Sequence, residues 1–266
     1  MKYKLRTYSI LEAGQRKDSE GNPHQEDNIF PEYGKQSDSD RLFILCDGMG
    51  GHDAGEVASA TVCQALSSSI LSSSRKRDGE FTKEDFNRAM ASAYKALDEK
   101  DNGASRKMGT TMTLLSLHDD GAFIAHMGDS RIYHIRPGET GRDTEILHET
   151  EDHSLVNALI KAGELTREEA RKSRRKNIIT RAMQPNVVPK SKADTYETRD
   201  IRKDDYFLLC SDGMLEQSDM EDGSALRQIF SNAGGKDEEK IRQLISATEG
   251  NRDNHSAIII HIIDAE

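Results

Sequence analysis

The chain has 266 residues, of which 35% are hydrophobic and 32% charged, and it carries a net charge of −10. With a pI near 5.5 and a mean hydropathy of −0.75, it is poorly suited to binding nucleic acids or anionic membranes. The three cysteines show no CxxC spacing, the N-terminus lacks a secretory signal, and the apolar runs are too short to span a membrane, so we expect a cytoplasmic protein without disulfides.

The first half of the chain is predicted to contain an apolar strand followed by two helices. Residues 41–46 form a short apolar run, which predicts a buried strand. Apolar residues near helical spacing predict a helix over 56–71 that ends in a surface loop at 72–77. A second helix is predicted to begin at Thr82, because two acids follow in its first turn and an apolar stripe lines one face.

The second half of the chain is rich in predicted strands. Segment 163–176 is dense in charged residues and nearly devoid of large apolar ones, which predicts a mobile flap or a solvated helix. Asp152-His153-Ser154 is expected to cap a helix through Ile160. The remaining predicted elements are strands at 110–117, 123–126, 131–135, 144–147, 193–198, 206–210 and 257–263 and helices at 224–230 and 238–247. This order predicts an α+β protein.

Five aspartates lie beside apolar runs or glycine turns. Acids at strand ends next to glycines gather hard oxygen ligands at one edge of a sheet. Carboxylates held close together repel one another unless a cation lies among them. The pattern therefore predicts a divalent-metal site and one domain over 1–266, because the acids must share that site. The five are Asp27, Asp47, Asp129, Asp212 and Asp253.

Oxygen-rich ligands select Mg²⁺ or Mn²⁺ over zinc. A zinc alternative stays open because His52, His126 and His255 lie near the acids. Asp47 is the expected bridge between two ions, since the Gly48 carbonyl beside it can also ligate. Asp47-Gly48 could instead be an ordinary strand-to-helix turn, but the same Asp-Gly pair recurs after another three apolar residues at 212–213.

Two other phosphate chemistries are excluded by the sequence. No cysteine is followed at the sixth position by arginine, so a cysteine-phosphatase loop is missing. No glycine-rich segment is followed by the lysine and hydroxyl residue of a P-loop. A metal-bound water, with no protein nucleophile, remains as the attacking group.

Seven motifs occur in an order that resembles the metal-dependent protein phosphatases (PPM), the type 2C serine/threonine phosphatases. The Met-Gly-Gly-His form of the second motif and the chain length resemble the bacterial branch. The motifs are Gln25-Glu26-Asp27, Asp47-Gly48-Met49-Gly50-Gly51-His52, Gly109-Thr110-Thr111, Gly128-Asp129-Ser130-Arg131, Asp152-His153-Ser154-Leu155-Val156, Ser211-Asp212-Gly213 and Asp253-Asn254.

The resemblance implies a four-layer α/β/β/α sandwich of two antiparallel sheets flanked by helices, with Mn²⁺ or Mg²⁺ in a cleft at one edge and a flap at about 163–181. Two ions are implied, with a third in some states. Asp47 and the Gly48 carbonyl would hold the pair, Asp212 and Asp253 would complete it, and Asp129 would serve the third ion.

The resemblance also implies residues that support these ligands. Asp27 would hold metal-bound waters, with Glu26 behind it. His52 and Asn254 are expected to shape the site through packing and hydrogen bonds rather than to react. Arg131, next to Asp129, is expected to be a structural ion-pair partner.

The chain departs from the family pattern at two positions. The substrate-phosphate arginine often found five residues before the first aspartate is replaced by Asn22. Arg16 is the substitute candidate for substrate binding, if the insertion after it loops out. Met49 stands where the animal branch has a histidine that follows Asp-Gly, so the group that protonates the leaving oxygen is not identified.

The expected activity is hydrolysis of phosphoserine and phosphothreonine in proteins, opposing a bacterial serine/threonine kinase. Expected partners are phosphorylated proteins, including that kinase and its substrates, without nucleic acid or membrane. A monomer is favoured, although the oligomeric state is open. Two alternatives remain: a silent relative that only binds phosphoproteins, and a hydrolase of small phosphoesters.

Overall fold

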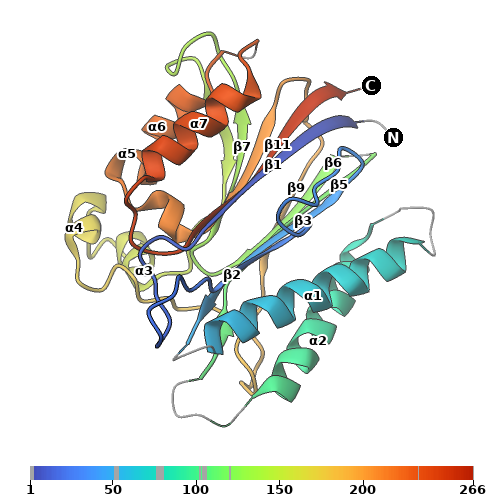
Figure 1. Cartoon of the computed structure of the whole chain (residues 1–266), viewed down its shortest axis with the longest axis vertical. Coiled ribbons are helices and arrows are strands. Elements are labelled where there is room, and N and C mark those ends of the chain that lie inside the picture. Colours follow the sequence, from blue (N-terminus) through green and yellow to red (C-terminus); the bar gives the residue numbers. More distant parts are fainter. Residues whose placement is uncertain are drawn as a thin grey trace.

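The computed structural model describes residues 3–50, 54–75, 81–101, 103, 107–119, 121–232 and 234–265. In this part of the chain, two antiparallel sheets pack face to face and helices cover both outer faces (Figure 1). The predicted four-layer α/β/β/α sandwich is therefore confirmed. Within the same ranges, no helix combines the length and the apolar character that a membrane crossing requires.

The two sheets have five and six strands. The first has the order β1-β11-β10-β7-β8, and the second has the order β2-β3-β5-β6-β9 with β4 paired to β3. The strands of the first sheet are β1 Tyr3–Glu12, β7 Arg131–Arg136, β8 Glu145–Glu149, β10 Tyr206–Cys210 and β11 His255–Ala265. Those of the second are β2 Asp27–Phe30, β3 Leu42–Met49, β4 Gly109–Thr110, β5 Met112–His118, β6 Gly121–Met127 and β9 Asp194–Thr198.

Two helical layers cover the sandwich. Helices α1 (Ala54–Arg75) and α2 (Lys83–Lys100) lie on the second sheet, while α5 (Ser218–Glu221), α6 (Ser224–Ile229) and α7 (Asp237–Thr248) lie on the first (Figure 1). The short helices α3 (Leu155–Lys161), α4 (Arg167–Lys172) and the 3-10 turn η1 (Asp212–Leu215) lie between strands.

Three buried clusters fill the spaces between the layers. The middle cluster lies between the sheets and includes Ile29 and Leu45 from the second sheet and Leu209 and Ile258 from the first. The outer clusters join each sheet to its helices. Because side chains alternate along a strand, the residues two positions away from these four on the same strands also face the space between the sheets. This alternation places several polar residues at one end of that space.

Most predicted elements are present, and two expectations need correction. Strands β1 and β2 were not predicted, because neither contains a continuous apolar run. Helix α1 continues through 72–75 instead of ending in a loop there, since serine and arginine are compatible with a helix. In the flap segment, the predicted alternative of a solvated helix is present as the capped helix α4.

Candidate metal centre and active site

The strand register brings the first two acids together. Asp27 lies directly opposite Asp47 in the antiparallel pair of β2 and β3. Residues opposite one another in such a pair project from the same face with their Cβ atoms only about 4.5–5.5 Å apart. Two residues earlier on β3, Leu45 lies in the core between the sheets, so Asp47 ends that inner face.

Backbone contacts hold Asp47 in place. Its N–H donates to Thr111 Oγ1 at 2.9 Å, and its carbonyl accepts from Thr111 N and Thr110 Oγ1, both at 2.9 Å. Gly48 follows where the chain has no room for a side chain, because a Cβ there would lie 2.2 Å from the Gly55 carbonyl oxygen. The Gly109-Thr110-Thr111 motif therefore supports Asp47 through hydrogen bonds.

Asp129 is supplied by the turn between β6 and β7, where the chain passes from one sheet to the other. Gly128 allows this turn because its φ is +109°, a conformation that residues with a side chain rarely adopt. His153 forms two hydrogen bonds with the same glycine. Its Nδ1 accepts from Gly128 N at 3.1 Å, and its backbone N–H donates to Gly128 O at 2.8 Å. The Asp129 side chain is buried.

Asp212 and Asp253 come from the first sheet. Asp212 begins η1 immediately after β10, and Asp253 precedes β11. Glu216 fixes the second of these loops, because its carboxylate accepts from Asp253 N at 2.8 Å and from Arg252 N at 3.1 Å. All five predicted aspartates thus come from strand ends or turns at one edge of the sandwich.

Their electrostatics show that they share one site. Burial, together with the charges of Asp212 and Asp253, raises the pKa of Asp27 to about 7. Burial and the charge of Asp253 likewise raise the pKa of Asp212 to about 6. The pKa of Asp47 lies well above its usual range because of burial and the charges of all four other aspartates. Without a cation, these carboxylates are difficult to ionise together.

The donor set fits a hard divalent cation. Asp27 Oδ1 and Asp129 Oδ1 are both buried and have no hydrogen-bond partner among the described residues. A carboxylate oxygen in that situation carries a large desolvation cost unless a cation or its water faces it. Carboxylate and main-chain oxygens are the ligands that Mg²⁺ and Mn²⁺ prefer. The residues therefore fit the metal pair expected from the sequence.

Arg16 lies at the same edge, beside one of the predicted ligands. Its guanidinium binds Asp253 with both prongs, Nε to Oδ1 at 2.7 Å and Nη2 to Oδ2 at 3.0 Å, and its Nη1 lies 3.5 Å from Glu26 Oε2. The residues after it form a small hairpin, in which Lys17 bridges to Pro23 and His24 N donates to Arg16 O at 3.1 Å. The insertion thus loops out and leaves Arg16 at the cleft.

The predicted supporting residues have different roles. Asn254 joins three loops: its Nδ2 donates to Ala13 O at 2.9 Å and His24 O at 2.8 Å, and its Oδ1 accepts from Glu26 N at 2.8 Å. The Glu26 carbonyl accepts from Gly48 N at 3.1 Å. His52 lies outside the described residues.

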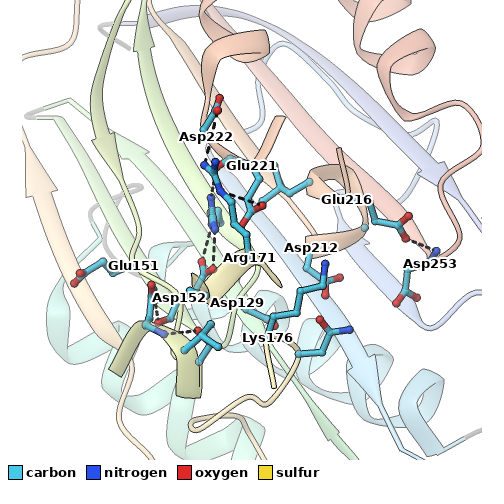
Figure 2. A pocket seen from close by; sticks show the side chains of 18 of the residues that line it. Asp129, Glu151, Asp152, Arg171, Lys176, Asp212, Glu216, Glu221, Asp222 and Asp253 are labelled. Carbon is cyan, nitrogen blue, oxygen red and sulfur yellow. Dashed lines mark hydrogen bonds and ion pairs between the residues drawn. The ribbon is translucent and has the colours of Figure 1, made fainter. Parts of the chain in front are cut away.

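A cleft of about 1000 Å³ opens in front of these acids. Figure 2 shows Asp212 and Asp253 among the residues that line it, together with the flap side chains Arg171 and Lys176. Arg171 lies 3.6 Å from Glu221 Oε2 and 3.8 Å from Asp222 Oδ2, so ion pairs link the flap to α5. Arg131 lines the cleft but binds Asp152 at 2.6 and 2.7 Å, which confirms its predicted role in an ion pair.

Another group of potential ligands among the described residues, His126, His153 and Asp194, offers atoms within 4.8 Å of one another. His153 Nδ1 already accepts a hydrogen bond, so its Nε2 carries the proton and donates to Asp194 at 3.2 Å. The two histidine rings stack with centroids 4.6 Å apart and planes at 13°. The lone pairs of the two rings therefore lie in separate, nearly parallel planes, and the hydrogen bonds of His126 Nε2 with Glu151 O and of His153 with Gly128 and Asp194 already occupy these ring nitrogens. This group supports the Asp129 turn instead of binding metal.

Sequence reasoning missed three polar residues of the site. Ser211 and Ser256 donate hydrogen bonds to Asp27, and Glu216 orders the Asp253 loop. The sequence identifies Ser211 only as part of the Ser211-Asp212-Gly213 motif, without a role of its own. Ser256 gave no separate signal, because its role depends on which strand lies beside it.

A sequence model described as protein phosphatase 2C matches residues 13–245. The chain is 37% identical over 193 residues to the protein phosphatase PhpP of Streptococcus pneumoniae serotype 2, covering 72% of this chain and 73% of that protein. Among solved structures, the serine/threonine phosphatase PstP/Ppp of Mycobacterium tuberculosis has a TM-score of 0.72 at 27% identity, covering 97% of this chain and 98% of that one. The catalytic domain of PstP in complex with two manganese ions has a TM-score of 0.71 at 28% identity, covering 98% and 99% of the two chains.

A sandwich with an acidic edge and a cleft in front of it thus defines the class of a metal-dependent phosphatase. The chain belongs to the protein phosphatase 2C family. These relationships confirm the class predicted from the sequence, a protein serine/threonine phosphatase of the bacterial metal-dependent type.

Proposed function

We propose that the acidic edge binds two divalent cations, Mn²⁺ or Mg²⁺, and that with them the chain removes phosphate from phosphoserine and phosphothreonine in proteins. The observation that carries the proposal is the gathering of five aspartates from both sheets at one edge, three of which line the cleft. Burial and the charges of neighbouring aspartates raise the pKa values of four of them, Asp27, Asp47, Asp129 and Asp212. Asp47 would help to hold both ions, the Gly48 carbonyl would bind one of them, Asp212 and Asp253 would complete the other, and Asp129 would serve a third.

The cations supply charge neutralisation for the phosphoryl group and a water of lowered pKa when bound. The chain itself offers no competing nucleophile among the described cysteines, because Cys46, Cys63 and Cys210 are all buried. Arg16 is placed at the cleft beside Asp253, where its planar fork can receive phosphate oxygens. The cleft is open, which suits a residue presented on a protein.

The wider role follows from this substrate class. Every phosphate on serine or threonine has been placed there by a kinase, so the enzyme would oppose a serine/threonine kinase. The unpaired cysteines are compatible with a cytoplasmic location. The family match over 13–245 supports treating 1–266 as one phosphatase domain with a flap at about 163–181.

Phosphate release from a phosphothreonine peptide tests the proposal. We expect release with Mn²⁺, none in excess chelator, and a loss of at least about 100-fold when Asp47→Asn removes a charge meant to face both ions. The exposed Arg242 on α7 provides the matched control, Arg242→Gln. Full activity in chelator would exclude the metal mechanism. Faster hydrolysis of sugar or nucleotide phosphates than of the peptide would point to small phosphoesters instead.

A further inference from the structure

One carboxylate of the acidic edge, that of Asp27, accepts hydrogen bonds from two serines. Ser211 Oγ donates to Asp27 Oδ2 at 2.9 Å, and Ser256 Oγ donates to the same oxygen at 2.7 Å. All three side chains are at most 2% exposed. The contact joins the two sheets, because Asp27 belongs to β2 in the second sheet, while Ser211 directly follows β10 and Ser256 lies on β11 of the first.

The register explains why the two serines meet at this point. Cys210 pairs with Ala257, and one step further Ser211 N donates to Ser256 O at 3.0 Å. Two residues before Ser211 and two after Ser256, Leu209 and Ile258 face the middle core. By strand alternation the serines continue that inner face, where it reaches Asp27.

The hydrogen-bond directions are fixed as well. Ser211 Oγ accepts from Ser256 N at 2.9 Å, so its single proton is left for an acceptor elsewhere. Asp27 Oδ2 is the nearest acceptor, since the carbonyl oxygens of Asn254 and Ser256 lie 3.5 Å away. Two hydroxyl donors on one oxygen prevent the carboxylate from rotating. The other oxygen, Oδ1, is buried without a partner among the described residues.

We propose that Ser211 and Ser256 are positioning residues, which hold Asp27 so that its Oδ1 faces the metal pair or a water bound to it. The inference rests on the metal site of the proposed function. A hydroxyl pair is suited to this role because it stabilises the carboxylate without adding a charge that would compete with the cations. Such outer hydrogen bonds typically contribute about 10–100-fold in metal affinity.

Calorimetric titration of Mn²⁺ into chelator-treated protein tests the proposal without substrate. We expect the double variant Ser211→Ala/Ser256→Ala to bind Mn²⁺ about 10–100-fold more weakly than wild type, while its phosphatase rate recovers substantially at saturating Mn²⁺. Ser116→Ala, a buried serine on β5 away from the acids, should keep wild-type affinity. If the alanine variants do not fold, Ser256→Cys fills nearly the same space with a much weaker donor.

A thermodynamic cycle separates positioning from general support of the fold. In an Asp27→Asn background the serine substitutions should weaken Mn²⁺ binding no further, because their effect is routed through that carboxylate. Wild-type Mn²⁺ affinity in the double variant would overturn the proposal, and so would an equal loss in the Asp27→Asn background. Either result leaves the phosphatase assignment intact if wild-type protein still hydrolyses the phosphopeptide.

Discussion

Arg16 and Asp253 are 237 positions apart and form a two-pronged ion pair at the cleft. The pair places a cation of the protein beside a carboxylate proposed to bind metal. Arg16 is about half exposed, so its guanidinium can also reach into the cleft. The same side chain can therefore neutralise Asp253 before metal uptake and contact a phosphate afterwards.

This double role predicts separate effects on substrate and on metal. Arg16→Gln should raise the KM for a phosphothreonine peptide by about 10–100-fold, since charge-assisted hydrogen bonds contribute about 1.5–3 kcal/mol. Its Mn²⁺ affinity should stay level or increase, because a competing positive charge is removed. Steady-state kinetics and calorimetry check the two expectations. A large loss of Mn²⁺ affinity with unchanged KM would show that Arg16 serves only to orient Asp253.

Asp27 gives a pH-dependent prediction for the metal-free protein. Its folded pKa of about 7 is higher than the ordinary value of about 3.9. The folded state therefore binds more protons than the unfolded state between these values, and stability falls as pH rises through that window. In chelator, Asp27→Asn should melt about 3–8 °C above wild type at pH 7.5 and lose most of this gain at pH 5. An equal gain in melting temperature at both pH values would contradict the raised pKa of Asp27.

The β6–β7 turn shows how neighbouring residues position Asp129, a proposed metal ligand. Its glycine provides the unusual φ, while the helix α3 region provides His153, which contacts that glycine at both backbone groups. His126 stacks on His153, and its Nε2 lies 2.8 Å from the Glu151 carbonyl oxygen. The placement of Asp129 thus depends on a pair of buried rings.

We expect His153→Ala to lower the free energy of unfolding by about 1–3 kcal/mol, because the buried Gly128 N–H loses its acceptor. His148→Ala is the matched control, since His148 stacks on Tyr196 at a half-buried position, and it should cost less. Denaturant unfolding of both variants in chelator measures the difference. An equal decrease in the free energy of unfolding in both variants would mean that the Gly128 hydrogen bond does not add to the stability of the protein.

The four layers of the whole molecule are joined by buried polar contacts in addition to the apolar core. Asp237, at the start of α7, accepts from Tyr206 OH at 2.7 Å and contacts His261 Nδ1 at 2.9–3.0 Å. Arg6 and Tyr8 on β1 reach the same carboxylate at 3.3–3.4 Å. The Asp237 side chain thereby links α7 to three strands of the first sheet, β1, β10 and β11. Its partner Tyr206 begins β10, at the end of that strand away from Asp212.

Asp237→Ala should destabilise the protein by about 3–5 kcal/mol at pH 7, because it leaves buried partners unpaired. These partners lower the pKa of Asp237 to about 2, although its burial alone would raise it. The contribution is therefore present above about pH 4 and is lost as pH falls toward 2. Denaturant unfolding at pH 7 and pH 3 should show a smaller difference from wild type at the lower pH. Glu238→Ala, one residue further along α7, serves as the exposed control.

The elements that could be predicted are those in which a local pattern is sufficient. The strand at 206–210 is a continuous apolar run and was predicted at its observed bounds, and Thr82 begins α2 with a capping box to Asp85. Strand β1 could not be predicted in the same way, because only its pairing with β11 makes its mixed sequence a strand. The proposed metal-binding aspartates could be predicted because each lies beside an apolar run or a glycine turn, which is a local signal.

The rest of the site depends on contacts between distant segments. The Arg16–Asp253 pair and the two serines behind Asp27 are set by the sheet register and by the packing of one sheet on the other. No spacing within a single segment reports such contacts. Predictions from sequence therefore identify the proposed ligands of this site more readily than the residues proposed to orient them.

The most direct test of a shared metal centre is the number of Mn²⁺ ions that the chain binds, measured by calorimetry after treatment with chelator. We predict two ions per chain in wild type and a loss of tight binding in Asp47→Asn, while that variant stays folded and melts at least as high as wild type in chelator. Wild-type protein that binds no Mn²⁺ at millimolar concentration, or an Asp47→Asn variant that binds both ions unchanged, would contradict the account.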